Sequence, residues 1–316
     1  MSWFKRGKKR QPGWLALGMR ADRVDLVHVK RTVTGRPEIV LCDSFRKEGS
    51  DTDTLMRLRK ELKLDEYRCT TLLPCSQYQL HQIEAPAVPA AELKSAVRWR
   101  LKDVIDYPVE SATLEVLEIP ADPAGLPSGR GLFAVTARTD AVAGYIRAFQ
   151  SAQVSLAALD IGELAQRNVS SLFEAEREGV AMLAFYADDG MLTFTYGGEM
   201  CVSRRIEIPA AQFMDDDPTN RADILERITL AVQRSLDHFE REFPYVPLSR
   251  LLIAPLPREI GLHDYLTTHI DGKVESADLA AVMDLAAVPE LKRPERQADF
   301  LPMIGAALRG EEAAAA

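Results

Sequence analysis

The sequence predicts an α/β protein of two lobes that share one plan. Its 316 residues are enough for two domains of ordinary size. Residues 13–42 follow the pattern strand, turn, strand, turn, strand, and the same order restarts at Gly179 and runs to Ile208, about 165 residues later. Helical and strand patterns alternate after each unit, which is typical of α/β folds. The predicted organisation is a tail at 1–12, a first lobe at 13–178, a second lobe at 179–309 and a tail at 310–316.

Each element of the first lobe has its own signal. In the meander, 14–18 is almost wholly apolar and predicts a buried strand, whereas 24–30 alternates and predicts a strand with one wet face. Leucines at helical spacing predict a helix over 52–62. The Pro-rich segment 85–89 predicts the start of a helix over 90–106, because proline suits a first helical turn. We also expect strands at 38–42, 69–73, 78–83, 114–119, 131–137 and 154–159, and helices at 139–150 and 161–176.

The second lobe repeats the meander and then turns helical. Clusters of glycine and aspartate at 188–190 and 197–198 predict the two turns of the meander. The amphipathic stretch 223–241 is the clearest helix of the chain. The expected strands are 180–186, 191–196, 200–208 and 251–253, and the remaining helices are 260–269, 279–285 and 300–308.

The composition is that of an acidic protein that needs no disulfide bond for stability. Its formal net charge is −8, and an acidic body argues against nucleic-acid binding. Its four cysteines form no CxxC pair and its histidines no HExxH motif, so we expect free thiols in a reducing compartment and no metal site. No apolar run reaches the roughly 18 residues of a membrane-spanning helix. We therefore expect a cytoplasmic protein.

Residues 1–10 differ from the rest of the chain in charge. They hold five basic side chains and no acid, together with two aromatic side chains. Such a segment can contact an anionic membrane surface, since each basic residue near it adds about 1 kcal/mol. A solvated tail is the alternative. The residues concerned are Trp3, Phe4, Lys5, Arg6, Lys8, Lys9 and Arg10.

Four phrases, in order along the chain, resemble signatures of one family. They are 96–99 (Ala-Val-Arg-Trp) with 104–108 (Val-Ile-Asp-Tyr-Pro), 159–165 (Leu-Asp-Ile-Gly-Glu-Leu-Ala), 233–239 (Gln-Arg-Ser-Leu-Asp-His-Phe) and 300–309 (Phe-Leu-Pro-Met-Ile-Gly-Ala-Ala-Leu-Arg). These phrases are similar to those of the type IV pilus assembly proteins of the PilM family. Within it, the closest likeness is to the MshI proteins of the mannose-sensitive haemagglutinin (MSHA) pilus.

The resemblance covers about 13–309 and implies a two-lobed, actin-like fold of the FtsA/PilM type. It implies a subdomain inserted in the first lobe, here at about 85–137. It also implies a second subdomain in the C-terminal lobe. Only about 15 residues separate Ile208 from the long helix at 223–241, so this second subdomain should be much reduced.

The resemblance also identifies where actin-like ATPases hold their nucleotide. In the first meander, Ala16 stands in place of an aspartate, Gly18 is retained, and Arg23 stands in place of a lysine. In the second, Ala184 replaces an aspartate and Tyr186 a glycine. The missing aspartates matter because Mg²⁺ prefers oxygen ligands. Small turn residues matter because they let backbone N–H groups reach phosphate oxygens.

The adenosine loop is altered as well. Ala254 and Pro255 lie where the family has a pair of glycines. Because three separate elements are lost together, we expect a degenerate pocket, no cofactor, no metal and no enzymatic activity. An active ATPase with a diverged pocket is the alternative.

The function implied by the resemblance is a cytoplasmic scaffold for pilus assembly, peripheral to the inner membrane. Its expected partner is the N-terminal cytoplasmic peptide of an inner-membrane PilN-like protein, and other components of the pilus machinery are further candidates. The matched residues nearest the expected groove are Arg98, Trp99, Asp106, Tyr107 and Pro108. Trp99 and Tyr107 could instead seat the helix on its own subdomain. A cytoplasmic component of type II secretion resembling GspL is the alternative function.

Overall fold

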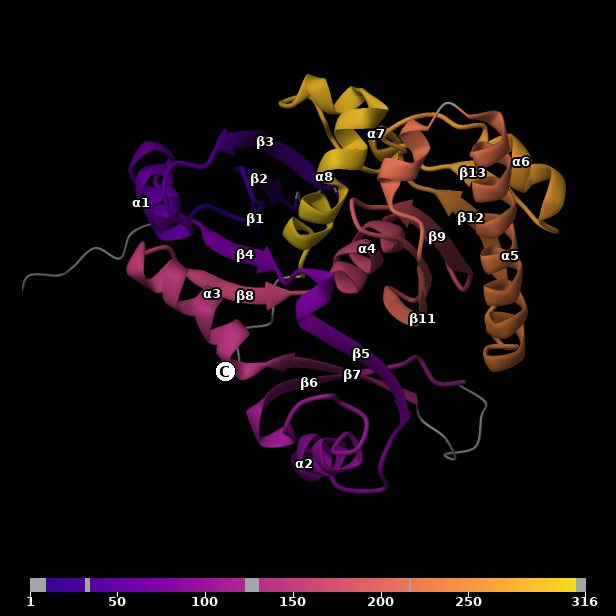
Figure 1. Cartoon of the computed structure of the whole chain (residues 1–316), viewed down its shortest axis with the longest axis horizontal. Coiled ribbons are helices and arrows are strands. Elements are labelled where there is room, and N and C mark those ends of the chain that lie inside the picture. The colour runs from indigo at the N-terminus through magenta and orange to yellow at the C-terminus, as the bar shows by residue number, and fades with distance from the viewer. Residues whose placement is uncertain (1–9, 32–34, 123–130, 216, 311–316) are drawn as a thin grey trace, which may run out of the picture.

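Two five-stranded sheets of the same topology form the body of the protein (Figure 1). The computed structural model describes residues 10–31, 35–122, 131–215 and 217–310. In each sheet an antiparallel meander continues into two parallel strands. The first sheet has the order β3 (Glu38–Arg46), β2 (Arg23–Lys30), β1 (Trp14–Met19), β4 (Arg68–Leu72) and β8 (Leu156–Asp160).

The second sheet repeats this order strand by strand. Its strands are β11 (Glu199–Ile206), β10 (Gly190–Tyr196), β9 (Gly179–Phe185), β12 (Leu248–Ile253) and β13 (Val274–Ser276). The edge strand β13 is absent from the sequence-based predictions, because three residues are too few to produce a hydrophobic period. The duplicated topology confirms the two-lobed α/β fold class.

Helices cover the outer faces of the sheets and fill the space between them. The first helix starts where Ser50 and Asp53 form a reciprocal capping box, and the longest starts at Pro218 after the N-cap Asp217. The helices are α1 (Asp51–Leu62), α2 (Ala90–Arg100), α3 (Thr139–Ser151), α4 (Gly162–Ser170), α5 (Pro218–Glu242), α6 (Leu262–His269), α7 (Leu279–Val282) and α8 (Pro294–Ala307). Short 3₁₀ turns occupy Leu64–Glu66, Cys75–Gln77, Val109–Ser111, Ser171–Phe173, Ala210–Met214 and Pro289–Lys292.

A continuous apolar core joins the two lobes, because α4 and α8 lie between the sheets (Figure 1). The helices approach closely at Gly305, where an added Cβ would lie 2.1 Å from the carbonyl oxygen of Ala165. The prediction that one face of β2 is exposed to solvent is therefore wrong. Six of its eight residues are buried, since α8 returns from the far end of the chain and packs on it.

Three helices are shorter than predicted. Helix α2 ends at Arg100 and not at 106, α4 gives way to the 3₁₀ turn Ser171–Phe173 before 176, and α7 has four residues. In each case an apolar residue beyond the helix end is still buried: Ile105, Phe173 and Leu285. The spacing of apolar residues therefore predicted helices that are too long, because the chain continues to pack into the core after each helix has ended.

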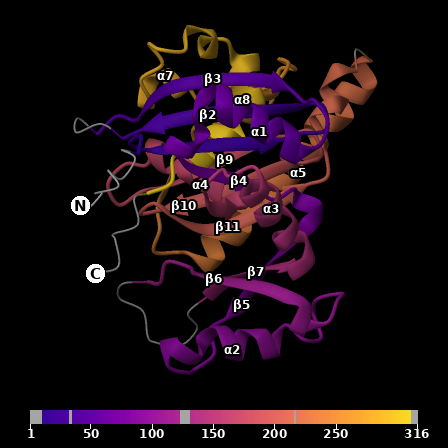
Figure 2. The ribbon, with the colours of Figure 1, turned by 90° about the vertical axis from the view of Figure 1, so that its left-hand side faces the viewer.

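A third sheet extends from the first lobe and carries α2 on its outer face (Figure 2). Its order is β5 (Tyr78–Glu84), β7 (Gly131–Arg138) and β6 (Ala112–Glu118). The opposite face reaches the second lobe, where Phe133 joins the core that contains Phe239. The Tyr245 hydroxyl also donates to the Pro120 carbonyl at 2.7 Å. This small sheet, the inserted subdomain, therefore contacts both lobes.

The second lobe has no comparable extension in its described residues. Between β11 and α5 the regular structure is the 3₁₀ turn Ala210–Met214, in agreement with the reduced subdomain that the chain length predicts. In the described parts of the chain, no helix is both long and apolar enough to cross a bilayer.

Candidate functional site

The turn between β1 and β2 is held by a buried carboxylate. Asp25, on β2, is almost fully buried and accepts from Arg20 Nε at 2.5 Å and from Arg23 Nε at 2.9 Å. The Ser44 hydroxyl donates to the same carboxylate at 2.6 Å. Arg20 also donates to the carbonyl of Asp299 on α8 at 3.0 Å. Both arginines of this turn are therefore engaged within the protein.

The C-terminal helix covers the retained glycine of β1. A Cβ added at Gly18 would lie 2.8 Å from Met303 Sδ, so the methionine side chain lies directly against this backbone. Ala16 on β1 and Ala184 on β9 are both buried in the core that also contains Met303 and Ala165. Two short side chains at these strands allow α4 and α8 to fill the space between the sheets.

The turn between β9 and β10 is closed by a tyrosine. Tyr186 donates its hydroxyl to Gln166 Oε1 at 2.6 Å, and its backbone N–H donates to the Asp189 carbonyl at 2.8 Å. Burial raises the pKa of Tyr186, so the hydroxyl stays neutral and acts as a donor. Gln166, on α4, uses its amide nitrogen to bond the Met182 carbonyl at 2.8 Å. The tyrosine thereby connects this turn to the helix between the lobes.

A buried ion pair joins the lobes beside this turn. Glu163, 1% exposed at the start of α4, accepts from Arg205 Nη2 of β11 at 2.9 Å and from the Tyr78 hydroxyl of β5. The Arg205 guanidinium also lies over the Tyr78 ring, 5.1 Å from its centroid. One carboxylate thus links the inserted subdomain, the helix between the lobes and the second lobe. We call these three residues the interlobe clamp.

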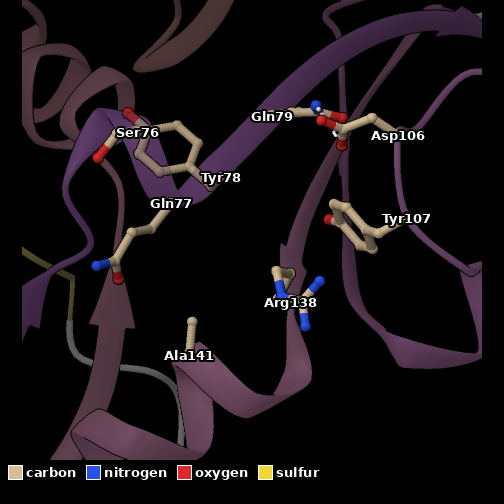
Figure 3. A pocket seen from close by; sticks show the side chains of 8 residues that line it. All are labelled: Ser76, Gln77, Tyr78, Gln79, Asp106, Tyr107, Arg138 and Ala141. Atoms are coloured by element: carbon tan, nitrogen blue, oxygen red, sulfur yellow. Dashed lines mark hydrogen bonds between the residues drawn. The ribbon is translucent and has the colours of Figure 1, made fainter.

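A groove of about 310 Å³ opens between the first lobe and the inserted subdomain. Figure 3 shows Asp106 and Tyr107 on one side and Gln77 and Ala141 on the other. The Asp106 carboxylate accepts from Gln79 Nε2 at 3.2 Å. The complete lining is Ser76, Gln77, Tyr78, Gln79, Asp106, Tyr107, Arg138 and Ala141.

No family model matches the chain, and no curated protein matches it significantly. A solved structure described as the PilM-PilN type IV pilus biogenesis complex matches it with a TM-score of 0.69 and 21% identity, over 95% of this chain and 99% of that chain. The protein has the two-lobed actin-like fold.

Two other solved structures are more distant. The cytoplasmic domain of EpsL, an inner membrane component of the type II secretion system of Vibrio cholerae, gives a TM-score of 0.48 at 14% identity, over 78% of this chain and 83% of that chain. A Bacteroides thetaiotaomicron protein with an actin-like ATPase fold gives 0.49 at 10% identity, over 90% of this chain and 96% of that chain.

An actin-like fold raises the question of whether a nucleotide fits between the meander turns. The hollow beside Tyr186 has a volume of about 120 Å³ and is bounded by Pro302 of α8. Pockets for small-molecule ligands usually have about 300–1,000 Å³. At the predicted adenosine loop, Ala254 is buried and Pro255 has no N–H to offer. The degenerate nucleotide pocket that the resemblance implies stays a prediction.

The structure separates the five residues proposed for partner binding. Asp106 and Tyr107 line the groove, whereas Arg98 donates to the carbonyls of Val109 at 2.7 Å and Ala112 at 2.9 Å and so fixes its own subdomain. Trp99 is 69% exposed, so it does not seat α2 as the alternative supposed.

Several residues beside the groove were not identified from the sequence. Gln77, Tyr78 and Arg138 line it, although the phrase 96–108 that predicts Asp106 and Tyr107 contains none of them. Pro108 is exposed and precedes the 3₁₀ turn Val109–Ser111 without lining the groove. Of the predicted membrane contact, residues 3–9 lie outside the described part of the chain and Arg10 is exposed, so that contact stays a prediction.

Proposed function

We propose that this protein is an actin-like scaffold of pilus assembly that captures an extended segment of a partner protein. Its occupied site would be the groove between the first lobe and the inserted subdomain. The observation that carries the proposal is the position of Asp106 and Tyr107 in that groove, because the phrase 104–108 resembles the PilM family. The fold likeness to a PilM-PilN complex supports it.

The proposed partner is the cytoplasmic N-terminal segment of an inner-membrane, PilN-like protein. Grooves of this kind take extended peptides through main-chain hydrogen bonds and side-chain pockets. Here the polar groups are Asp106, which is bonded to Gln79, and Arg138, which is paired with Asp140, and Tyr107 offers an aromatic wall. We place the protein at the cytoplasmic face of the inner membrane, and its phrases favour the MSHA type of pilus. The protein would thus hold assembly components together without chemistry of its own.

Replacing Tyr107 with alanine should weaken binding of the partner segment by about 1–2 kcal/mol, or about 5- to 30-fold in dissociation constant. The loss follows from removal of a groove wall whose aromatic ring anchors the peptide. Fluorescence anisotropy with a labelled synthetic peptide of the PilN-like protein's cytoplasmic N-terminus measures it. Trp99→Ala is the matched control, since Trp99 lies outside the groove lining and should leave the affinity unchanged.

Circular dichroism of both variants verifies that they are folded. Tyr107→Phe adds a second comparison, because the hydroxyl has no hydrogen-bond partner among the described residues and its removal should be tolerated. Equal affinities of the wild-type and folded Tyr107→Ala proteins would place the partner elsewhere.

Mg-ATP should not raise the thermal unfolding midpoint of the protein. A ligand that binds only the native state at 100 times its dissociation constant stabilises by about 2.7 kcal/mol, which a melting curve detects readily. We expect no shift and no phosphate release, because Met303 covers Gly18 and Tyr186 closes the second turn. A concentration-dependent shift together with turnover would instead support the diverged ATPase.

A further inference from the structure

The groove does not end at the inserted subdomain. A second hollow of about 240 Å³ lies along α3, and it shares Gln77 and Ala141 with the groove. Because the same side chains border both, the two hollows are neighbours, with Asp106 in the first and Met19, at the end of β1, in the second. The lining of the second hollow is Met19, Asp51, Gln77, Asp140, Ala141, Gly144, Tyr145, Ala148 and Phe149.

One face of α3 forms the floor of this second section. Ala141, Gly144, Tyr145 and Ala148 recur at positions i, i+3, i+4 and i+7, so they share that face. Glycine weakens a helix interior relative to alanine. A Cβ added at Gly144 would nevertheless meet no atom within 4 Å. Packing within the chain therefore does not require this glycine, and the space above it is open toward the hollow.

The two sections differ in chemistry. The first presents the exposed carboxylate of Asp106, which accepts a hydrogen bond from Gln79 Nε2 and has a second oxygen to offer. In the second, both acids already have partners, since Asp51 pairs with Lys47 and Asp140 with Arg138 at 2.8 Å. What the second section presents to a ligand is mainly the apolar surface of its floor and of Met19. It suits an apolar side chain, whereas the first section suits a polar one.

We propose that the partner segment continues past the inserted subdomain, crosses α3 at Gly144 and places an apolar side chain between Met19 and Tyr145. This inference rests on the proposed function and extends it. From Ala141 to Ala148 the helix rises about 10 Å, which an extended chain covers with about three residues. Those residues extend the segment beyond the part that the first section holds, and the shared border favours one continuous occupant over a second protein.

Gly144→Gln tests this path, because the Cβ of the new side chain meets no atom within 4 Å and the side chain starts beside the second section. Arg147→Gln is the control, since it places the same side chain on the exposed side of α3. Three synthetic peptides serve as probes: the full cytoplasmic N-terminus of the PilN-like protein, and two versions shortened by three residues, one from each end. Anisotropy gives the affinities, and thermal melting verifies the folds.

We expect Gly144→Gln to lower the affinity for the full peptide about tenfold. The variant should then bind the full peptide as weakly as the wild-type protein binds one of the shortened peptides. The affinity for that shortened peptide should be the same in both proteins. Arg147→Gln should alter neither. Met19→Gln, from the facing strand, should reproduce the loss and covers the case in which Gly144→Gln fails to fold. Equal binding of the full peptide to wild-type and Gly144→Gln protein would overturn the inference and leave the proposed function standing. Failure of every peptide to bind the wild type would overturn both.

Discussion

Gly305→Ala should destabilise the protein by about 3 kcal/mol, because overpacking a tight core typically costs about 1–3 kcal/mol and this contact is to backbone. The added Cβ would lie 2.1 Å from the carbonyl oxygen and 2.6 Å from the carbonyl carbon of Ala165. Backbone of α4 cannot rotate away as a side chain would. The Asn168 side chain also bonds the Gly305 carbonyl at 2.9 Å, which holds the two helices in place. Helices α4 and α8 would have to separate.

Urea unfolding followed by circular dichroism measures this loss. Gly144→Ala is the matched control, since it is the same substitution in a helix where the Cβ meets no atom, and it should be neutral or stabilising by about 1 kcal/mol. If Gly305→Ala were as stable as Gly144→Ala, the close crossing of α4 and α8 would be incorrect.

Glu163→Ala should cost about 3 kcal/mol of unfolding free energy, since removing one partner of a buried ion pair leaves the other uncompensated. Arg205 and the Tyr78 hydroxyl would both lose their acceptor. Arg205 is 35% exposed, so water can recover part of its solvation, and the expected loss lies toward the low end of the range for buried pairs.

The exposed pair between Lys94 and Glu115 provides the control for this substitution. Its side chains are 60% and 65% exposed, and Glu115→Ala should cost less than about 1 kcal/mol. Both variants are compared by urea unfolding under one set of conditions. Similar losses for the two glutamates would mean that the interlobe clamp contributes no more to stability than a surface ion pair.

The sequence was sufficient to predict the architecture because the signals for it are local. Each meander carries its own apolar strands and turn residues, and the repeat at Gly179 is visible without any contact information. Two of the family phrases also meet in space. Asp160 pairs with Arg309, and Ala165 touches Gly305, so the phrases 159–165 and 300–309 correspond to the crossing of α4 and α8. Their similarity to a family thus has a packing explanation.

The features that sequence reasoning missed depend on long-range contacts. The buried state of β2 depends on α8, which lies more than 260 residues later in the chain. Tyr78, Glu163 and Arg205 belong to three different elements. Glu163 lies in the phrase 159–165, but nothing in the sequence identifies Tyr78 and Arg205 as its partners. Trp99 is exposed, which rejects the alternative that it seats α2 on its own subdomain, and its contact with a partner stays a prediction.

The groove was located only in part for the same reason. One wall, with Asp106 and Tyr107, belongs to a recognisable phrase. The other wall is formed by the start of β5 and by α3, which precede and follow that phrase in the sequence and meet it only in the folded protein.

Titration of the PilN-like peptide, with and without excess Mg-ATP, tests the central claim that this actin-like scaffold captures its partner without nucleotide. Isothermal calorimetry gives the heat of each ligand separately and the peptide affinity in both conditions. We predict that the peptide binds with the same dissociation constant in both titrations and that Mg-ATP alone gives no heat of binding. Peptide binding that appears only with Mg-ATP would contradict the account, because the space between the meander turns would then have to open for a nucleotide.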